Sequence, residues 1–315
     1  MYIYAKFVVT MYKRIILSLW TVIGILFAVG CSDYEPMDEF ESGKVSDFIK
    51  SDFYQRYSKD VDVTEAFTYY DNSTRISFID SDGLPCTAIY QGFEWVFTQK
   101  NYEKDDFAFL NQLPQNVARA YIRAGIDNED YQIDDAYVIE VSRNGFDNKF
   151  YEFEFTAPYS NNEITIEHFY FHLLIDEKGE LIDVLNSNVN PSIWWYNMND
   201  CVSYVNHRYP EAELLAAYND AGDNVLYIND KGIQKKVRFR QSNKDQIWSE
   251  TSYRLDNDIE LPESVRIGYE KYRTEHPDFI YDEVFHIERK DGIFYGLTMN
   301  VMSHNVFEET VYFKI

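Results

Sequence analysis

Apolar and polar residues alternate along several segments of this chain. Residues 150–155 read FYEFEF, with Tyr151, Phe153 and Phe155 separated by Glu152 and Glu154. The same alternation places Phe169, Phe171, Leu173, Val237 and Phe239 at apolar positions. A period of two is typical of a strand that buries one face and exposes the other. The sequence therefore predicts antiparallel sheets that carry helices on one face only, which is an α+β fold.

Two nine-residue segments share the pattern Leu-Pro-x-x-Val-x-x-x-Tyr. One starts at Leu113 (LPQNVARAY) and the other at Leu261 (LPESVRIGY). In both, the Val, the Tyr and a further apolar residue follow the spacing i, i+4, i+7, which predicts one buried stripe of a helix. The Pro suits the first turn of such a helix, because that position needs no N–H donor. Each predicted helix precedes a strand that ends in Asn144-Gly145 or Asp291-Gly292, and these dipeptides are typical of tight hairpin turns.

Other motifs recur at a similar distance. The segment FYQRY at residues 53–57 resembles VNHRY at residues 205–209, and Trp95 has a counterpart in Trp248. The separations are all about 150 residues and differ only by loop-sized insertions. A long repeat of this kind indicates two tandem copies of one fold.

The N-terminal residues have the pattern of a bacterial lipoprotein signal. A basic start, MYKR, is followed by the apolar run 15–29, which is shorter than the ~20 residues of a membrane-spanning helix. The run ends in AVGC, which resembles the lipobox, where the cysteine is lipidated and becomes the mature N-terminus. We expect a signal peptide over residues 1–30, a lipid on Cys31 and an acidic tether over residues 31–44. The mature protein is then anchored at the outer membrane, on its periplasmic or cell-surface side. An ordinary signal peptide with an unrelated cysteine is the alternative.

The predicted order of elements resembles the PepSY-like family with β-lactamase-inhibitor-like architecture, found in secreted lipoproteins of Bacteroidetes. The Leu-Pro-x-x-Val helix start, helices that close near Arg208-Tyr209 or His276-Pro277, and the strand-turn-strand that follows carry this resemblance. We expect one such domain over residues 45–188 and a second over residues 189–315, each with two helix-hairpin units. The start VSDF at residue 45 departs from the Leu-Pro pattern. The resemblance implies a binding module without catalytic residues, because the inhibitors of this family grip an enzyme with the open face of the sheet.

The composition and the motifs argue against several functions. The net charge is -24 at pH 7, and such a field repels the phosphate backbone of nucleic acids. The sequence has no Cys-x-x-Cys, His-Glu-x-x-His, Gly-x-Ser-x-Gly or glycine-rich phosphate loop. We therefore expect neither an enzyme nor a cofactor, and no binding to nucleic acid.

Two further groups of residues are candidates for a metal site or a disulfide bond. His168 and His172 form His-x-x-x-His, but four residues of strand separate them by roughly 13 Å, which is too far for one metal ion. No metal site is therefore expected. Cys86 and Cys201 make no disulfide framework, and we expect two buried, unpaired thiols.

The helix-free side of the sheets is the predicted binding surface. Its expected residues are His168, Tyr170, His172, Arg238 and Arg240. A solvated sheet face does not need tyrosine and histidine in a row, so we expect this side to contact a protein partner, such as an envelope peptidase. An uncovered face without a partner is the alternative.

A surface glycan-binding lipoprotein is the alternative function. Trp194, Trp195 and Tyr196 follow Asn190-Pro191 at the junction of the two copies. Exposed rings there would stack on a sugar, whereas buried rings would seal the interface between the copies.

Overall fold

The computed structural model describes residues 45–102, 110–124, 135–160, 165–187, 198–220, 222–242, 245–256, 258–300 and 308–315. Val45–Ile315 form one compact unit. The predicted signal peptide and tether lie outside the described residues, as do Cys31, Trp194, Trp195 and Tyr196. No helix in the described ranges is long and apolar enough to cross a membrane.

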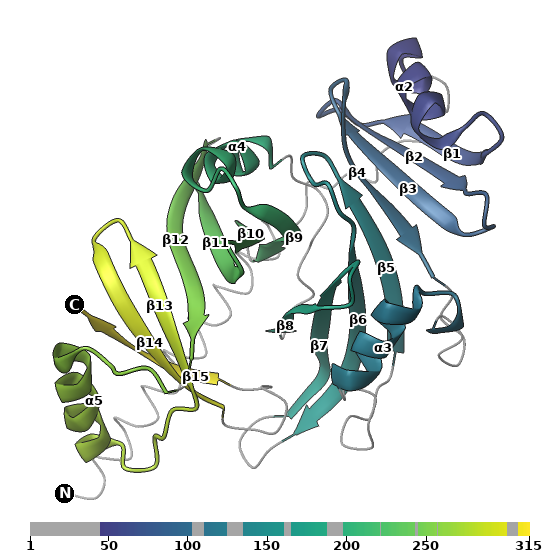
Figure 1. Ribbon diagram of the computed structural model, residues 1–315. Helices are drawn as coiled ribbons and strands as arrows, with labels where there is room; N and C mark the ends of the chain where they lie inside the picture. Colours follow the sequence, from purple (N-terminus) through teal and green to yellow (C-terminus); the bar gives the residue numbers. More distant parts are fainter. Residues whose placement is uncertain are drawn as a thin grey trace, which may run out of the picture. The chain divides into compact units, whose positions relative to one another are not determined.

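Helices and groups of strands alternate along the chain (Figure 1). The helices are α2 (Asp47–Tyr57), α3 (Gln115–Ala124), α4 (Asn199–Arg208) and α5 (Glu263–Glu275). The first sheet contains β1 (Asp62–Thr68), β2 (Ser73–Ile79), β3 (Pro85–Gln91), β4 (Glu94–Asn101), β5 (Asp135–Arg143), β6 (Phe150–Ser160), β7 (Thr165–Asp176) and β8 (Leu181–Ser187). The second sheet contains β9 (Glu213–Asp220), β10 (Asp223–Asp230), β11 (Ile233–Ser242), β12 (Asp245–Leu255), β13 (Glu283–Arg289), β14 (Gly292–Asn300) and β15 (Glu308–Lys314).

Both sheets are antiparallel meanders, in which each strand pairs with its neighbours in the chain. The first sheet has the order β1-β2-β3-β4-β5-β6-β7-β8, and the second has the order β15-β14-β13-β12-β11-β10-β9. The predicted α+β fold is therefore confirmed. Four strands follow each of α2, α3 and α4, where the sequence pattern predicted one hairpin per helix.

Helix α3 covers one face of the first sheet. Val117 and Tyr121 of α3 are buried in one cluster with Phe153 and Phe155 of β6. The rings of Tyr121 and Phe153 stack with their centroids 4.7 Å apart. The side chains of residues 156–171, which include Phe169 and Phe171, lie outside the described part of the chain.

Helix α2 covers the same face at the other end of this sheet. Phe53 of α2 and Cys86 of β3 belong to one buried cluster. Cys86 pairs in register with Lys100, and Lys100 pairs with Glu140 of β5. Paired residues share a face, and Val138, two positions from Glu140, packs under α3. Both helices therefore lie on one side, as predicted.

The second sheet repeats this arrangement with α4 and α5. Val205 of α4 is buried together with Val237 and Phe239 of β11. Tyr272 of α5 packs on the cluster that contains Leu297 of β14. The prediction that helices cover the side of Phe153, Phe155, Val237 and Phe239 is confirmed.

The Arg-Tyr pair that ends α2 is fixed to β4. Trp95 Nε1 donates to Thr98 Oγ1 at 2.9 Å, and the hydroxyl of Tyr57 is hydrogen-bonded to the same oxygen. The guanidinium of Arg56 lies 4.5 Å from the centroid of the Trp95 ring, a cation–π contact. Four side chains thus join the end of the helix to the fourth strand that follows it.

The same four residue types meet at the end of α4. Trp248 Nε1 donates to Thr251 Oγ1 at 2.9 Å, and the Tyr209 hydroxyl donates to that oxygen at 3.4 Å. The Arg208 guanidinium lies 5.8 Å from the Trp248 ring centroid. The Arg-Tyr and Trp motifs matched in the sequence therefore occupy corresponding places in two helix-and-strand units. The domain boundaries at residues 188 and 189 stay a prediction.

In both Leu-Pro motifs, the proline stands one position before the helix. Pro114 and Pro262 immediately precede α3 and α5, so neither lies within the first turn. Their carbonyl oxygens accept hydrogen bonds from Ala118 N at 3.0 Å and Arg266 N at 2.9 Å. Each proline thus closes the first turn from its N-terminal side.

The two predicted glycine turns differ from each other. Arg289 pairs with Gly292 in register, so the tight turn consists of Lys290 and Asp291. The connection between β5 and β6 spans residues 144–149, because Phe146 leaves the turn to pack on the buried cluster under α4. Asn144 and Gly145 do form a tight turn, in which Phe146 N donates to the Arg143 carbonyl at 3.1 Å and Gly145 has a φ of 82°. This turn is only part of the longer connection, so the predicted two-residue hairpin loop is wrong.

Both described cysteines are buried free thiols, as the sequence predicted. Burial raises the pKa of Cys86 to about 12 and that of Cys201 to about 12. Each thiol therefore stays protonated and behaves as a small apolar core residue.

His286 is a half-buried histidine on the helix-covered face of β13. Its ring stacks on Tyr253 at 4.8 Å and meets Tyr295 edge-on at 5.7 Å. Burial lowers the pKa of His286, Glu288 opposes this shift, and Lys235 adds to it. The folded protein therefore resists protonation of this ring.

This shift predicts a loss of stability in acid. The unfolded chain binds the proton near pH 6.5, before the folded protein does, so stability falls as the pH drops below that value. We expect the melting temperature of His286→Phe to fall less than that of the wild type between about pH 7.5 and about pH 5.5, because phenylalanine keeps the stacking and does not titrate. Calorimetry at both pH values measures this difference. Equal falls in the two proteins would contradict the prediction.

Candidate functional site

The structure places His172 away from solvent. His168, Tyr170 and His172 all belong to β7, but the side chains of the first two lie outside the described part. His172 is completely buried, so its prediction as an exposed contact residue is wrong. Its neighbours in register and along β7, Leu185 and Leu174, belong to a buried cluster that includes residues of the second sheet.

The helix-free faces of the two sheets pack on each other in this region. The shared cluster contains Ile139, Val141, Phe150, Leu174, Ile182 and Leu185 from the first sheet, and Leu215, Ala216, Tyr218, Val225 and Tyr227 from the second. At its margin, the Tyr227 hydroxyl donates to Asp183, and Lys236 Nζ lies 3.4 Å from the same carboxylate. Glu152 and Glu154 are consequently buried as well, although their alternation with aromatic residues predicted a solvated polar face.

Arg238 and Arg240 lie on the helix-free face of β11, as predicted, because Val237 and Phe239, which alternate with them, belong to the buried cluster under α4. Arg238 is half-buried, and its Nη1 lies 3.4 Å from Asp223 Oδ2. Arg240 is exposed. The predicted basic residues thus border an uncovered part of the second sheet.

The part that no described helix or strand covers spans β11 to β15 and is named the Arg–aromatic face. Its residues are Arg240, Ile247, Glu250, Arg289, Phe294 and Tyr312, and the strand registers place them on one side. At its centre, Arg289 Nε donates a hydrogen bond to Glu250 Oε2 at 2.8 Å. Arg289 Nη2 lies 2.7 Å from the same oxygen. The Arg289 guanidinium also lies 5.1 Å from the Phe294 centroid and 4.9 Å from the Tyr312 centroid. One arginine is therefore held by a carboxylate and by two rings.

Tyr312 is the most exposed ring of this face, with 51% of its surface accessible. It pairs in register with Gly296, and a Cβ at Gly296 would lie 3.6 Å from Tyr312 Cε1 and 3.0 Å from Ile287 Cδ1. The glycine leaves room for the ring to lie across the neighbouring strand. The face thus presents a supported aromatic surface to solvent. No local pattern in the sequence indicates it, because its residues come from separate strands.

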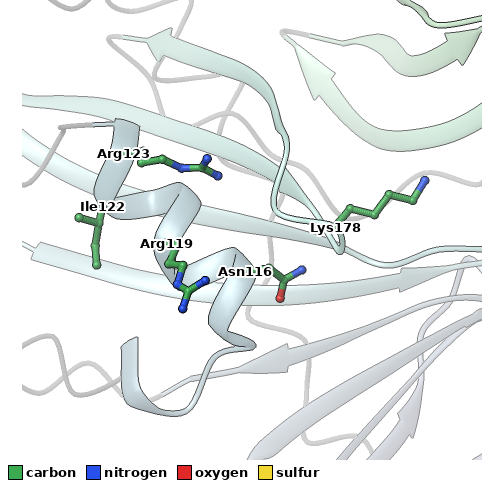
Figure 2. A pocket seen from close by; sticks show the side chains of 5 residues that line it. All are labelled: Asn116, Arg119, Ile122, Arg123 and Lys178. Carbon is green, nitrogen blue, oxygen red and sulfur yellow. The ribbon is translucent and has the colours of Figure 1, made fainter.

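A surface pocket of about 360 Å³ lies between α3 and the turn from β7 to β8. Figure 2 shows Asn116, Arg119, Ile122 and Arg123 projecting from α3, with Lys178 on the turn. Asn116 Nδ2 donates to the carbonyl of residue 177 at 2.5 Å, and Lys178 Nζ lies 2.7 Å from Glu213 Oε1. Asn116 thus holds the turn on α3, whereas Lys178 joins the turn to β9, and we assign the pocket no ligand.

One buried group has the chemistry of metal ligands. Glu152, Glu154 and His172 each bring a ligand-type atom within 4.8 Å of the others. In the sequence, the spacing groups His172 only with His168 on the same strand, and that pair predicts no metal site. Pairing between β6 and β7 creates this group, and no spacing within one strand reveals it.

The comparisons with known proteins concern the fold alone. No family model and no curated protein matches the chain. Among solved structures, a BLIP-like protein from Bacteroides fragilis is 16% identical over 48% of this chain and 92% of that chain, with a TM-score of 0.36. DUF2874 family proteins from Bacteroides ovatus and Bacteroides uniformis are 15% and 16% identical, over 46% and 49% of this chain and 90% and 95% of their own, with TM-scores of 0.33 and 0.31. Over about half of its length, the chain is thus similar to BLIP-like and DUF2874 proteins of Bacteroides.

Proposed function

We propose that this chain is a non-enzymatic lipoprotein of the cell envelope that binds a protein partner through the Arg–aromatic face. Its predicted lipid on Cys31 holds it at the outer membrane, on the periplasmic or cell-surface side. The exposed Tyr312 ring beside the fixed Arg289 guanidinium supports this function most directly.

Tyrosine and arginine suit such a surface for physical reasons. Both residue types are enriched among the side chains that dominate binding energy at protein interfaces. Arg289 is already held by Glu250 and by two rings, so a partner immobilises few additional side-chain rotamers when it binds. The packed region around Tyr218 and Tyr227 is covered by the first sheet, whereas Arg240, Ile247 and Tyr312 of the Arg–aromatic face are exposed among the described residues.

Photocrosslinking in intact cells tests the proposed surface. Tyr312 is replaced with the photoreactive p-benzoyl-phenylalanine, which keeps an aromatic ring at that position. We expect a light-dependent adduct with one protein of defined mass, because the ring lies in the contact. Mass spectrometry of the adduct identifies the partner.

Ile267 provides the matched control. It is 56% exposed and belongs to α5, which covers the opposite side of the same sheet. The same replacement at Ile267 is expected to give no such adduct, and Arg289→Ala is expected to weaken the Tyr312 adduct. Equal adducts from both positions, or none from Tyr312, would contradict the proposal. An adduct with carbohydrate would support glycan binding instead.

A further inference from the structure

Three ionisable side chains are buried together on the helix-free face of the first sheet. Glu152 and Glu154 stand two residues apart on β6, and His172 of β7 pairs in register with Glu154. Glu152 and His172 are completely buried, and Glu154 is 6% exposed. One imidazole nitrogen and one oxygen from each carboxylate lie within 4.8 Å of one another.

Two atoms of this cluster lack hydrogen-bond partners among the residues that the structure describes. They are Glu152 Oε2 and His172 Nε2. The other nitrogen, His172 Nδ1, lies 2.6 Å from Glu152 Oε1. A protonated histidine would match the charge of Glu152, but both atoms would still be unsatisfied, at a cost of about 1–3 kcal/mol each.

We propose that Glu152, Glu154 and His172 form a binding site for one divalent transition-metal ion of the Zn²⁺ type. Carboxylate oxygens and an imidazole nitrogen are ligands that such ions use in proteins. A dication offsets the charge of two carboxylates without requiring a protonated histidine. The absence of sulfur from the ligand set disfavours Cu⁺, and the imidazole disfavours Ca²⁺, which prefers oxygen ligands.

The geometry requires only small adjustments. Bonds of ~2.0–2.2 Å to one tetrahedral ion place ligand atoms roughly 3.3 Å apart. The 2.6 Å contact between His172 and Glu152 then opens, and separations of up to 4.8 Å close. Changes of at most about 1.5 Å lie within reach of the glutamate side-chain torsions, while pairing between β6 and β7 keeps the backbone fixed.

The surroundings suggest a structural role for the ion. Ile139 and Leu174 pair in register with Glu152, and Leu185 pairs with His172. All three belong to the cluster that joins the first sheet to the second. Because binding energy at a preformed site adds to folding energy, the ion is expected to stabilise the packing of the two sheets.

Zinc binding by the full-length protein, purified without a polyhistidine tag, tests this site. After dialysis against a chelator, Zn²⁺ alone is added, and metal content is measured by mass spectrometry. We expect about one ion per chain and a higher melting temperature than in the metal-free protein. Glu154→Gln and His172→Gln are each expected to weaken binding at least ~100-fold, because even the loss of an outer-shell partner costs 10–100-fold.

Glu140→Gln is the matched control for the loss of a buried carboxylate. Glu140 is 8% exposed on the opposite face of β5, where Lys149 and two tyrosine hydroxyls contact it. This variant is expected to bind zinc like the wild type. The visible spectrum of bound Co²⁺ in the wild type reports the ligands without any substitution. A folded wild type that takes up neither Zn²⁺ nor Co²⁺, or variants that bind as tightly as the wild type, would overturn the proposal.

Discussion

Replacing Gly179 with Ala is expected to lower the free energy of unfolding by at least ~3 kcal/mol. Gly179 has a φ of 82° in the turn between β7 and β8, a backbone conformation that costs an alanine about 1–2 kcal/mol. A Cβ there would also lie 2.5 Å from the carbonyl oxygen of Asn116 and 2.8 Å from its carbonyl carbon. Because the obstacle is backbone at the start of α3, relief requires the helix to move off the turn. Urea denaturation followed by circular dichroism measures the loss.

A substitution at Gly83 distinguishes the cost of backbone strain from the cost of contact with α3. Its turn has the same hydrogen bonds, with Asp80 in the place of Asp176, and its φ is 80°. A Cβ at Gly83 meets no atom within 4 Å. Gly83→Ala is therefore expected to cost only the ~1–2 kcal/mol of backbone strain. If the two substitutions cost the same, contact with α3 does not limit position 179.

The helix-covered faces could be predicted from the sequence because their signal is local. Alternation around Phe153 and Val237 and the spacing of Val117 and Tyr121 identify side chains that α3 and α4 bury. Each helix packs on strands of its own unit, so pattern and burial agree.

The helix-free faces could not be predicted in the same way. Alternation shows that Glu152 and His172 point away from α3, but it cannot show whether another sheet covers them. Their burial depends on residues such as Tyr218 and Tyr227, which come from a different sheet. Polar residues on a strand therefore predicted a solvated surface where the structure has a packed one.

The candidate surface was predicted only at its edge. Arg240 was expected on the helix-free side and lies there, whereas Arg289 and Tyr312 were not singled out. A signal for them existed in the pairing of Tyr312 with Gly296, since a glycine within a strand often marks a close approach by a neighbour. Reading that signal requires the order and register of β14 and β15, which the sequence alone does not specify.

Replacing Cys31 with Ala is expected to transfer nearly all of the protein from the detergent-extracted membrane fraction to the soluble fraction. The predicted anchor is the lipid on this thiol, and each buried CH₂ of a lipid chain contributes about 0.8 kcal/mol to membrane binding. The substitution removes the thiol to which this lipid is predicted to be attached. Fractionation with immunodetection, together with labelled fatty acid, measures the change.

Cys86→Ala is the control for the loss of a thiol. Cys86 is buried under α2 in the first sheet, and its loss removes one small core side chain without touching the signal sequence. This variant is expected to remain in the membrane fraction and to incorporate fatty acid like the wild type. Wild-type protein without label, together with Cys31→Ala protein that still requires detergent, would show that another feature attaches the chain. Because the Arg–aromatic face lies in β11 to β15 and not in the tether, the released Cys31→Ala protein should still form the Tyr312 adduct with a purified partner.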